Sequence, residues 1–382
     1  MTRTILPLCL GLSVAVLAQD RVVFEQQPAL RLSNDKLAMT VFPEGGAMAE
    51  ITLSDDAEHV NPLWNPTRIA RDAGLKPSTD LSRGHFVCVD GFGPASAEER
   101  AAGYPMHGEA HLLQWNLDSY QHQGGTASAA FSVKLPLAQE TFTRTYRLVD
   151  GENIVWVESG LESLLAFDRP VVWGEHATVG APFLEPGKVV VDMPVVKAKT
   201  KAYEFAGGVT NRQLRSFVDF NWPMAPTRDG QLFDVRSAPL KPGGLDHTTS
   251  LLDPARRLVF VTALHLETKL LIGWVFRREE FPWVQTWLSY PAANRMVRGM
   301  EFATQPFDLP RADVLRAGPL FDTPVFRVLP AKSKISASFL MFYTRVPEGF
   351  RKVDDVRLER GTLTIEDRGA GKTVSLPASR SL

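Results

Sequence analysis

Short apolar runs rich in β-branched and aromatic residues recur along this chain, and turn-forming residues separate them. Both their composition and their length are typical of β-strands. The 28 glycines and 27 prolines are spread along the sequence and exclude long helices. Only Ala95–Ala102 and Ala312–Ala317 have helical character, and both are short. The clearest strand runs are Leu37–Phe42, Ala129–Leu135, Thr141–Val149, Asn153–Ser159, Lys188–Val191, Leu258–Leu264, Leu271–Arg277, Trp283–Ser289, Lys334–Tyr343 and Thr362–Glu366.

Many short strands at close spacing predict an antiparallel sandwich or barrel. The sequence has no internal repeat and no low-complexity linker that would divide its 382 residues. We therefore expect an all-β fold, a single large antiparallel β-sandwich domain with a few short helices.

The first 18 residues have a different pattern, that of a secretory signal peptide. Arg3 is followed by an apolar run that ends at Ala18, just before Gln19. We expect residues 1–18 to be removed and residues 19–382 to form the exported domain, in the periplasm or outside the cell. The alternative, a membrane anchor, is disfavoured because a spanning helix needs about 20 apolar residues. No later run is long enough, so no membrane contact is expected after cleavage.

Charge and cysteine content narrow the partners. The 42 basic and 43 acidic side chains give a net charge of −1, which offers no electrostatic footprint for a nucleic acid. Loss of the signal peptide removes Cys9 and leaves Cys88 as the only cysteine. An intrachain disulfide is then impossible, and stability must come from the β core.

A few ionisable residues lie in unusual surroundings. His107 and His176 are in glycine-containing segments, and His247 directly follows Asp246. A histidine beside glycine is more often a hydrogen-bonding turn residue than a functional one. Glu301 is the stronger candidate, because an acid in the apolar run Gly299–Phe307 needs a partner or a function.

Several common chemistries lack their motifs. The G-x-S-x-G, G-x-G-x-x-G and P-loop patterns are absent from the sequence. His107 and His111 have the spacing of a metal-ligand pair only on a helix, and the segment around them is predicted to be a loop. We therefore expect neither a metal ion nor another cofactor.

The order of these residues resembles that of the galactose mutarotase (aldose 1-epimerase) superfamily. The resemblance extends over nearly the whole mature chain. It rests on an arginine about two dozen residues before a His-Gly pair, a second histidine in a Gly/Pro/Phe loop, an Asp-His pair and a late glutamate in a run similar to L-E-T-Q. Here these are Arg83, His107-Gly108, His176, Asp246-His247 and Glu301 with Gln305.

The resemblance implies a galactose mutarotase-like supersandwich and an isomerase that interconverts the anomers of a neutral sugar. A His/Glu pair suits this chemistry, because both groups can take and return a proton near neutral pH. It implies Glu301 as general base and His176 as general acid. The residues expected to bind the carbohydrate are His107, Arg83, Asp246, His247, Gln305, Trp173 and Trp287.

Two other functions are compatible with the sequence. A non-catalytic carbohydrate-binding protein on this fold would need no acid–base pair. A glycan-cleaving enzyme would need two carboxylates beside the bond, for which Glu109, Glu175, Asp246 and Glu301 are available. A sugar-phosphate epimerase would need a basic cluster such as Arg277-Arg278 with Arg295 and Arg298, but export disfavours a phosphosugar.

Overall fold

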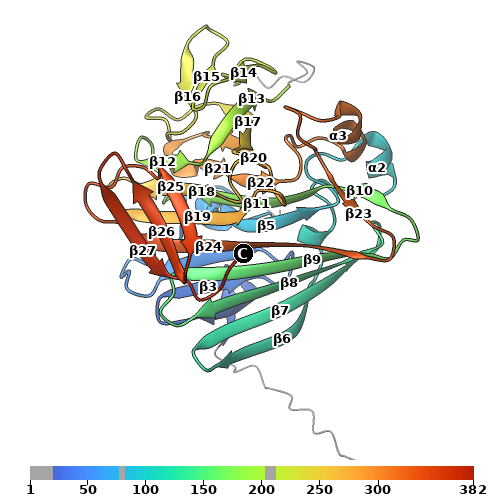
Figure 1. Cartoon of the computed structure of the whole chain (residues 1–382), viewed down its shortest axis with the longest axis horizontal. Coiled ribbons are helices and arrows are strands. Elements are labelled where there is room, and N and C mark those ends of the chain that lie inside the picture. Colours follow the sequence, from blue (N-terminus) through green and yellow to red (C-terminus); the bar gives the residue numbers. More distant parts are fainter. Residues whose placement is uncertain (1–19, 77–81, 203–211) are drawn as a thin grey trace, which may run out of the picture.

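The fold is a sandwich of two large antiparallel sheets, which confirms the all-β prediction (Figure 1). The computed structural model describes residues 20–76, 82–202 and 212–382. The predicted signal peptide, residues 1–18, lies outside the described residues. Among the described residues, no helix is long and apolar enough to cross a membrane.

The larger sheet has 12 strands and carries the candidate site. In spatial order its strands are β1 (Arg21–Phe24), β2 (Gln27–Ser33), β3 (Leu37–Val41), β4 (Met48–Leu53), β5 (His85–Val89), β11 (Trp173–Gly180), β21 (Val297–Gly299), β20 (Trp283–Ser289), β17 (Leu245–Leu252), β13 (Val195–Thr200) and β14 (Asp219–Phe220). The short strand β22 (Glu301–Ala303) also lies between β11 and β20 and pairs with both.

The second sheet has eight strands and closes the other side of the core. Its order is β12 (Val189–Asp192), β18 (Leu258–His265), β19 (Leu270–Arg277), β24 (Lys334–Arg345), β9 (Ile154–Ser163), β8 (Glu140–Val149), β7 (Thr126–Leu135) and β6 (Asn116–Gln123). Alternate residues of β7 and β8 are buried, as the pleat of a strand requires. Their inward side chains join those of the 12-stranded sheet in one large apolar core.

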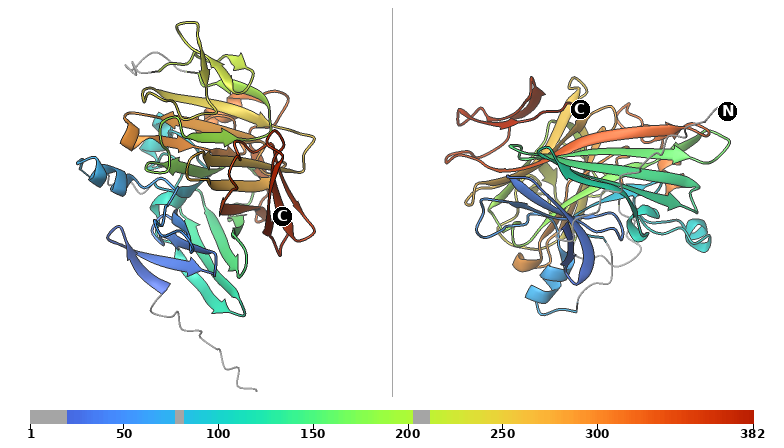
Figure 2. Two further views of the ribbon diagram at one scale, coloured as in Figure 1. Left: turned by 90° about the vertical axis from the view of Figure 1, so that its left-hand side faces the viewer. Right: turned by 90° about the horizontal axis from the view of Figure 1, so that it is seen from below.

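The C-terminal strands form a separate three-stranded meander, β25 (Asp355–Glu359), β26 (Thr362–Asp367) and β27 (Lys372–Pro377). Leu363 and Ile365 of this meander pack on Ile154, Leu340 and Phe342, which face away from the main core. The meander therefore covers the part of the outer face that β9, β18, β19 and β24 form, and Figure 2 shows it on the outside of the body.

Short elements complete the fold. Two small two-stranded sheets pair β10 (Arg169–Val171) with β23 (Arg327–Leu329) and β15 (Met224–Pro226) with β16 (Leu232–Asp234). The helices are α1 (Pro66–Asp72), α2 (Ala97–Ala101) and α3 (Arg311–Ala317), with 3₁₀ turns η2 (Ala110–Leu112) and η3 (Ala293–Arg295).

Most sequence-based elements are confirmed. Each of the predicted strand runs overlaps a strand, and the two predicted helices overlap α2 and α3. Helix α1 was not predicted, although its start has a clear sequence signal: Asn65 caps it through a bond from the Arg68 amide, and Pro66 follows.

Candidate active site

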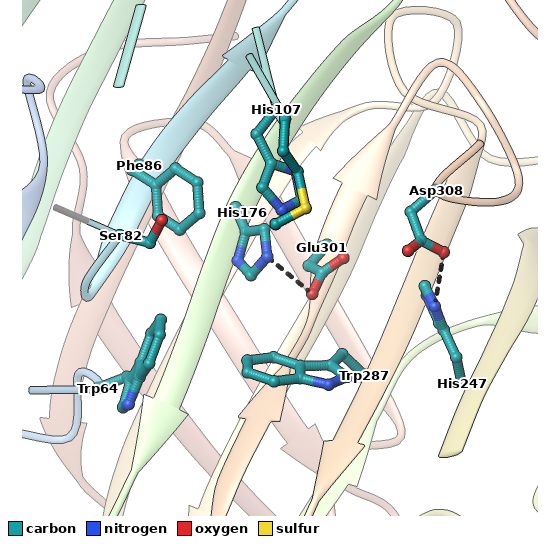
Figure 3. A pocket seen from close by; sticks show the side chains of 10 residues that line it. Trp64, Ser82, Phe86, His107, His176, His247, Trp287, Glu301 and Asp308 are labelled. Atoms are coloured by element: carbon teal, nitrogen blue, oxygen red, sulfur yellow. Dashed lines mark ion pairs between the residues drawn. The ribbon is translucent and has the colours of Figure 1, made fainter. Parts of the chain in front are cut away.

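A cavity of about 330 Å³ opens on the outer face of the 12-stranded sheet (Figure 3). Its size is that of a small-molecule site. The side chains that line it are mostly aromatic or ionisable: Trp64, Ser82, Phe86, Met106, His107, His176, His247, Trp287, Glu301 and Asp308.

Strand register explains why residues so far apart in sequence converge here. Residues paired across antiparallel strands point to the same face of a sheet. Phe86 on β5 pairs with His176 on β11, and His247 on β17 pairs with Trp287 on β20. The sequence neighbours of these residues point into the core instead, as Val87 does.

His176 and Glu301 form the ionisable centre of the cavity. Nε2 of His176 lies 3.3 Å from Oε1 of Glu301. The imidazole stacks on the Phe86 ring, with 4.3 Å between the ring centroids. Its Nδ1 lies 2.8 Å from Oγ1 of Thr178, and that hydroxyl donates to the His176 carbonyl. Nδ1 therefore donates to Thr178, and Nε2 is the nitrogen that can exchange a proton with Glu301.

Burial sets the protonation of this pair. It raises the pKa of Glu301 well above its usual 4.5, and the nearby charge of Asp308 adds to the rise. Burial also lowers the pKa of His176 well below its usual 6.5, with a further contribution from His107. Both directions favour the neutral forms. Of the two groups, Glu301 is therefore favoured as the holder of the exchangeable proton of the pair.

Gly299 makes room for the Glu301 carboxyl. A methyl group on Gly299 would overlap Oε1 of Glu301, which folds back over it two residues along the chain. Gly299 pairs with Thr178 of β11, next to His176. A side chain at this position would push the carboxyl away from the imidazole.

His107 enters the cavity from a tight turn. Its backbone has φ 64°, and Gly108 after it has φ 77°. A side chain on Gly108 would collide with the Val89 carbonyl, so only glycine fits there. The Gly93 amide donates to Nδ1 of His107 at 3.2 Å, which leaves the ring hydrogen on Nε2. The His107 ring lies 5.4 Å from that of His176, nearly perpendicular to it.

Two tryptophans give the cavity an apolar wall. Trp64 and Trp287 meet edge to face, with ring centroids 5.7 Å apart. Trp287 also lies 6.1 Å from the His176 ring. The backbone amide of Trp64 donates to the Thr178 carbonyl of β11, which fixes this wall to the sheet. Flat aromatic surfaces beside a proton-transfer pair suit a ring-shaped ligand with apolar C–H faces.

A second ionisable group lies on the other side of Glu301. Oδ1 of Asp308 lies 2.8 Å from Nδ1 of His247 and also accepts a bond from the Lys201 ammonium. Burial opposes the charge of Asp308, but these two partners outweigh it and lower the pKa of the carboxyl below its usual value. The cavity therefore contains a fixed carboxylate next to a neutral carboxylic acid.

Solved structures with the same architecture are numerous, although the sequence comparisons returned nothing: no family model and no curated protein matches the chain. A galactose mutarotase-related enzyme from Lactobacillus acidophilus is 14% identical, with TM-score 0.55 over 83% of this chain and 97% of its own. A galactose mutarotase-like protein from Clostridium acetobutylicum is 13% identical, with TM-score 0.56 over 85% and 98%. The Slr1438 protein of Synechocystis is 14% identical, with TM-score 0.56 over 84% and 96%.

The chain has the galactose mutarotase-like fold. The resemblance drawn from the sequence is thereby confirmed at the level of the fold. On this mutarotase-like scaffold the structure brings five of the expected site residues to the cavity: His107, His176, His247, Trp287 and Glu301.

Two other expected site residues point the wrong way, because successive side chains of a strand face opposite sides. Trp173 is fully buried in the core, where its indole donates to Glu175. Asp246 precedes His247 on β17 and therefore faces away from the cavity. Its carboxylate accepts the backbone amides of Gln213 and Leu214. Neither residue lines the cavity, and both are structural.

Arg83 and Gln305 also lie outside the cavity lining. Arg83 donates to Gln27 of β2 and stacks over the ring of Phe42, which directly follows β3, 4.8 Å from its centroid. The amide of Gln305 donates to the carbonyls of Phe92 and Phe307 and so holds the segment that follows β22. Both side chains are bonded to neighbouring segments of the protein and do not line the cavity, where a sugar contact was expected.

Sequence reasoning missed half of the lining, namely Trp64, Ser82, Phe86, Met106 and Asp308. Asp308 does have a local signal, since it follows the same turn-rich run as Glu301 and is also an acid beside apolar residues. Nothing local distinguishes Trp64 or Phe86 from core aromatic residues. Among the described residues, no group of three or more His, Cys, Asp or Glu side chains is arranged to hold a metal ion.

Proposed function

We propose that this protein is a sugar isomerase of the aldose 1-epimerase type, which interconverts the anomers of an aldose by acid–base ring opening. The observation that carries the proposal is the buried His176–Glu301 pair, 3.3 Å apart, in a cavity walled by Trp64 and Trp287. One neighbour on the same fold bears the name of a galactose mutarotase-related enzyme, which supports a sugar as ligand.

The chemistry needs two coordinated proton transfers. A base takes the proton of the C1 hydroxyl, an acid protonates the ring oxygen, and the C1–O5 bond breaks as a C1 carbonyl forms. Rotation about C1–C2 and the reverse transfers close the ring on the other face. With the proton on Glu301, that residue gives it to the ring oxygen while His176 accepts the hydroxyl proton. With the proton on His176 the roles exchange, as the sequence resemblance implied.

His107 supports this reaction from the facing turn. Because its Nδ1 accepts the Gly93 amide, its Nε2 carries a hydrogen suited to a sugar oxygen. A donor that is already oriented adds to transition-state stabilisation without reorganisation.

The decisive experiment is polarimetry on purified protein with freshly dissolved α-anomers of common aldoses. We expect the wild type to accelerate mutarotation over the buffer rate. Glu301→Gln and His176→Asn should each reduce kcat/KM by about 10²–10⁴-fold, the usual contribution of a positioned acid or base.

Matched controls are available on the surface. Glu359→Gln and His122→Asn make the same chemical changes at exposed positions and should leave the rate unchanged. Absence of acceleration with every aldose would sink the proposal. Binding that quenches tryptophan fluorescence without acceleration would instead favour the carbohydrate-binding alternative.

We also propose that the protein is exported by way of residues 1–18. The apolar run and the small residues before Gln19 support this. N-terminal sequencing of the protein from fractionated cells tests it: the exported form should begin at Gln19. Recovery of protein that still begins at Met1 in the cytoplasm would contradict it.

A further inference from the structure

We infer that Asp308 is the specificity-determining residue of the cavity and that it selects a neutral, hydroxyl-bearing ring over an anionic sugar such as a uronate or a sugar phosphate. This inference rests on the proposed function and deepens it.

The geometry of Asp308 leaves one carboxylate oxygen for a ligand. Among the described residues, its side-chain partners, Lys201 and His247, both bind Oδ1. The side chain is 23% exposed and belongs to the cavity lining. Figure 3 shows the other oxygen turned toward Glu301. The group is thus held from behind and offers Oδ2 to the ligand.

An ionised carboxylate can only accept hydrogen bonds. Its two partners keep Asp308 ionised, so Oδ2 requires a donor on the ligand. A sugar hydroxyl supplies one, whereas a carboxylate or phosphate dianion supplies none and adds like-charge repulsion. Asp308 therefore binds a hydroxyl group favourably and repels an anionic group at the same place.

The described lining offers an anion no arginine or lysine. Proteins bind carboxylates and phosphates mainly through arginine and lysine. No arginine or lysine is among the described residues that line the cavity, and the sequences of 77–81 and 203–211 contain none either. Lys201 is already engaged by Asp308, and its side chain is only 17% exposed.

Position within the cavity separates this role from the chemistry. Figure 3 shows His176 and Glu301 between two sides of the site, with Trp64, Phe86 and Ser82 on one side and Asp308 with His247 on the other. A ring over the His176–Glu301 pair would present its hydroxyls to Asp308. The residue contributes to recognition, and the proton transfers remain with the pair.

The test uses matched substrates: glucose with glucuronate, and galactose with galacturonate, which differ only in the oxidation of C6. We expect the full-length wild type to prefer the neutral member in both pairs. Asp308→Asn should lower kcat/KM for the neutral sugars by about 10- to 100-fold, the usual effect of losing a bond to a charged group. It should also reduce the ratio of kcat/KM between the neutral and the anionic sugar, because the side-chain amide of this variant can donate to a carboxylate.

Tryptophan fluorescence gives a binding readout that needs no turnover, since Trp64 and Trp287 line the cavity. Asp322→Asn, at an exposed position, is the matched control and should change nothing. Asp308→Glu keeps the negative charge and should still exclude uronates. If Asp308→Asn unfolds at a lower temperature than the wild type, this second variant shows whether the loss of charge or the loss of folded protein causes the change.

An unchanged ratio of kcat/KM between neutral and anionic sugars in Asp308→Asn overturns this inference, while an active wild type upholds the isomerase. A wild type that prefers uronates in binding also overturns it. Binding without acceleration overturns the isomerase alone.

Discussion

At the scale of single residues, neighbours on one strand serve different parts of the molecule. Glu175 and His176 are adjacent on β11, yet Glu175 faces the core and His176 the cavity. Glu175 accepts bonds from Arg144 at 2.5 Å and His85 at 2.9 Å. His85 in turn accepts the Trp274 indole on its other nitrogen, so it is neutral and donates to Glu175. This buried network fixes β11 from beneath and so fixes the imidazole above.

The pH dependence expected for the proposed reaction follows from the His176–Glu301 pair. If the form with one proton is active, activity falls in acid when His176 gains a second proton and falls in alkali when Glu301 loses its own. The pKa of His176 is lowered from 6.5 and that of Glu301 is raised from 4.5. We therefore expect kcat/KM to be flat through neutral pH, with an acid limb well below 6.5.

Glu301→Gln provides the check on that profile. Its residual activity should lose the alkaline limb, because the titrating carboxyl is gone. A wild-type activity that already declines as pH rises through 4.5 would show that Glu301 is ionised in the working enzyme and would contradict the assigned protonation.

Gly299 gives a prediction about position rather than charge. Gly299→Ala should displace the Glu301 carboxyl and lower kcat by about 10²-fold, the scale of a 1 Å misplacement. Gly369→Ala, in the C-terminal meander, is the control and should keep full activity. A crystal structure of the variant with Glu301 in its wild-type position, or an unchanged kcat, would show that Gly299 does not position the carboxyl.

At the scale of elements, one arginine joins the segments that carry His107 and Asp308. Arg311 at the start of α3 donates to Asp90, just after β5, at 2.8 Å and to Glu99 of α2 at 2.8 Å. His107 follows α2 in the chain, and Asp308 precedes α3. These side-chain bonds of Arg311, which we call the Arg311 clamp, therefore hold two sides of the cavity at a fixed separation. They add to the backbone hydrogen bonds of the sheet.

Arg311→Met should loosen this clamp. We expect a loss of about 1–3 kcal/mol in the free energy of unfolding, since bonds to charged partners are lost and Asp90 stays buried. The Michaelis constant should rise more than kcat falls. Arg316→Met, on the same helix but with an exposed ion pair to Asp313, should change neither quantity. Urea unfolding and steady-state kinetics measure both, and equal effects of the two variants would refute the clamp.

At the scale of the whole molecule, the two outer faces have different tasks. The outer face of the 12-stranded sheet carries the cavity, and part of the outer face of the eight-stranded sheet is covered by the C-terminal meander. In strand β9 successive residues face the two cores in turn: Val155 faces the main core, while Ile154 and Trp156 face the meander. The packing of the meander and the cavity therefore lie on opposite sides of the sandwich.

This separation predicts a variant that affects stability alone. Leu363→Ala in β26 removes a fully buried side chain and should cost about 2–5 kcal/mol in the free energy of unfolding. At a temperature where it stays folded, kcat and KM should equal those of the wild type. Leu240→Ala, at an exposed leucine, is the control. A large kinetic effect of Leu363→Ala would show that the two faces are coupled.

The strands and their all-β assembly could be predicted from the sequence because periodicity and turn formers are local signals. For the same reason Glu301 could be singled out, as an acid in an apolar run. His176 receives its role only through the family resemblance, because a histidine beside glycine is more often a turn residue. The pairing of Gln285 with Glu301, which sets Glu301 on the outer face of the sheet, depends on register and is invisible locally.

The sequence by itself determined the strand content, the short helices and the residue types available for acid–base chemistry. Tertiary structure alone decided which of them share a cavity. One residue along a strand reverses the face, so His247 reaches the site and Asp246 does not. Any odd number of residues does the same, so His176 reaches the site while Trp173, three residues before it, joins the core. Asp308 and Trp64 become site residues only because strand pairing brings together segments more than two hundred residues apart. Contacts of that kind are fixed by the packing of the sheets, and local sequence carries no record of them.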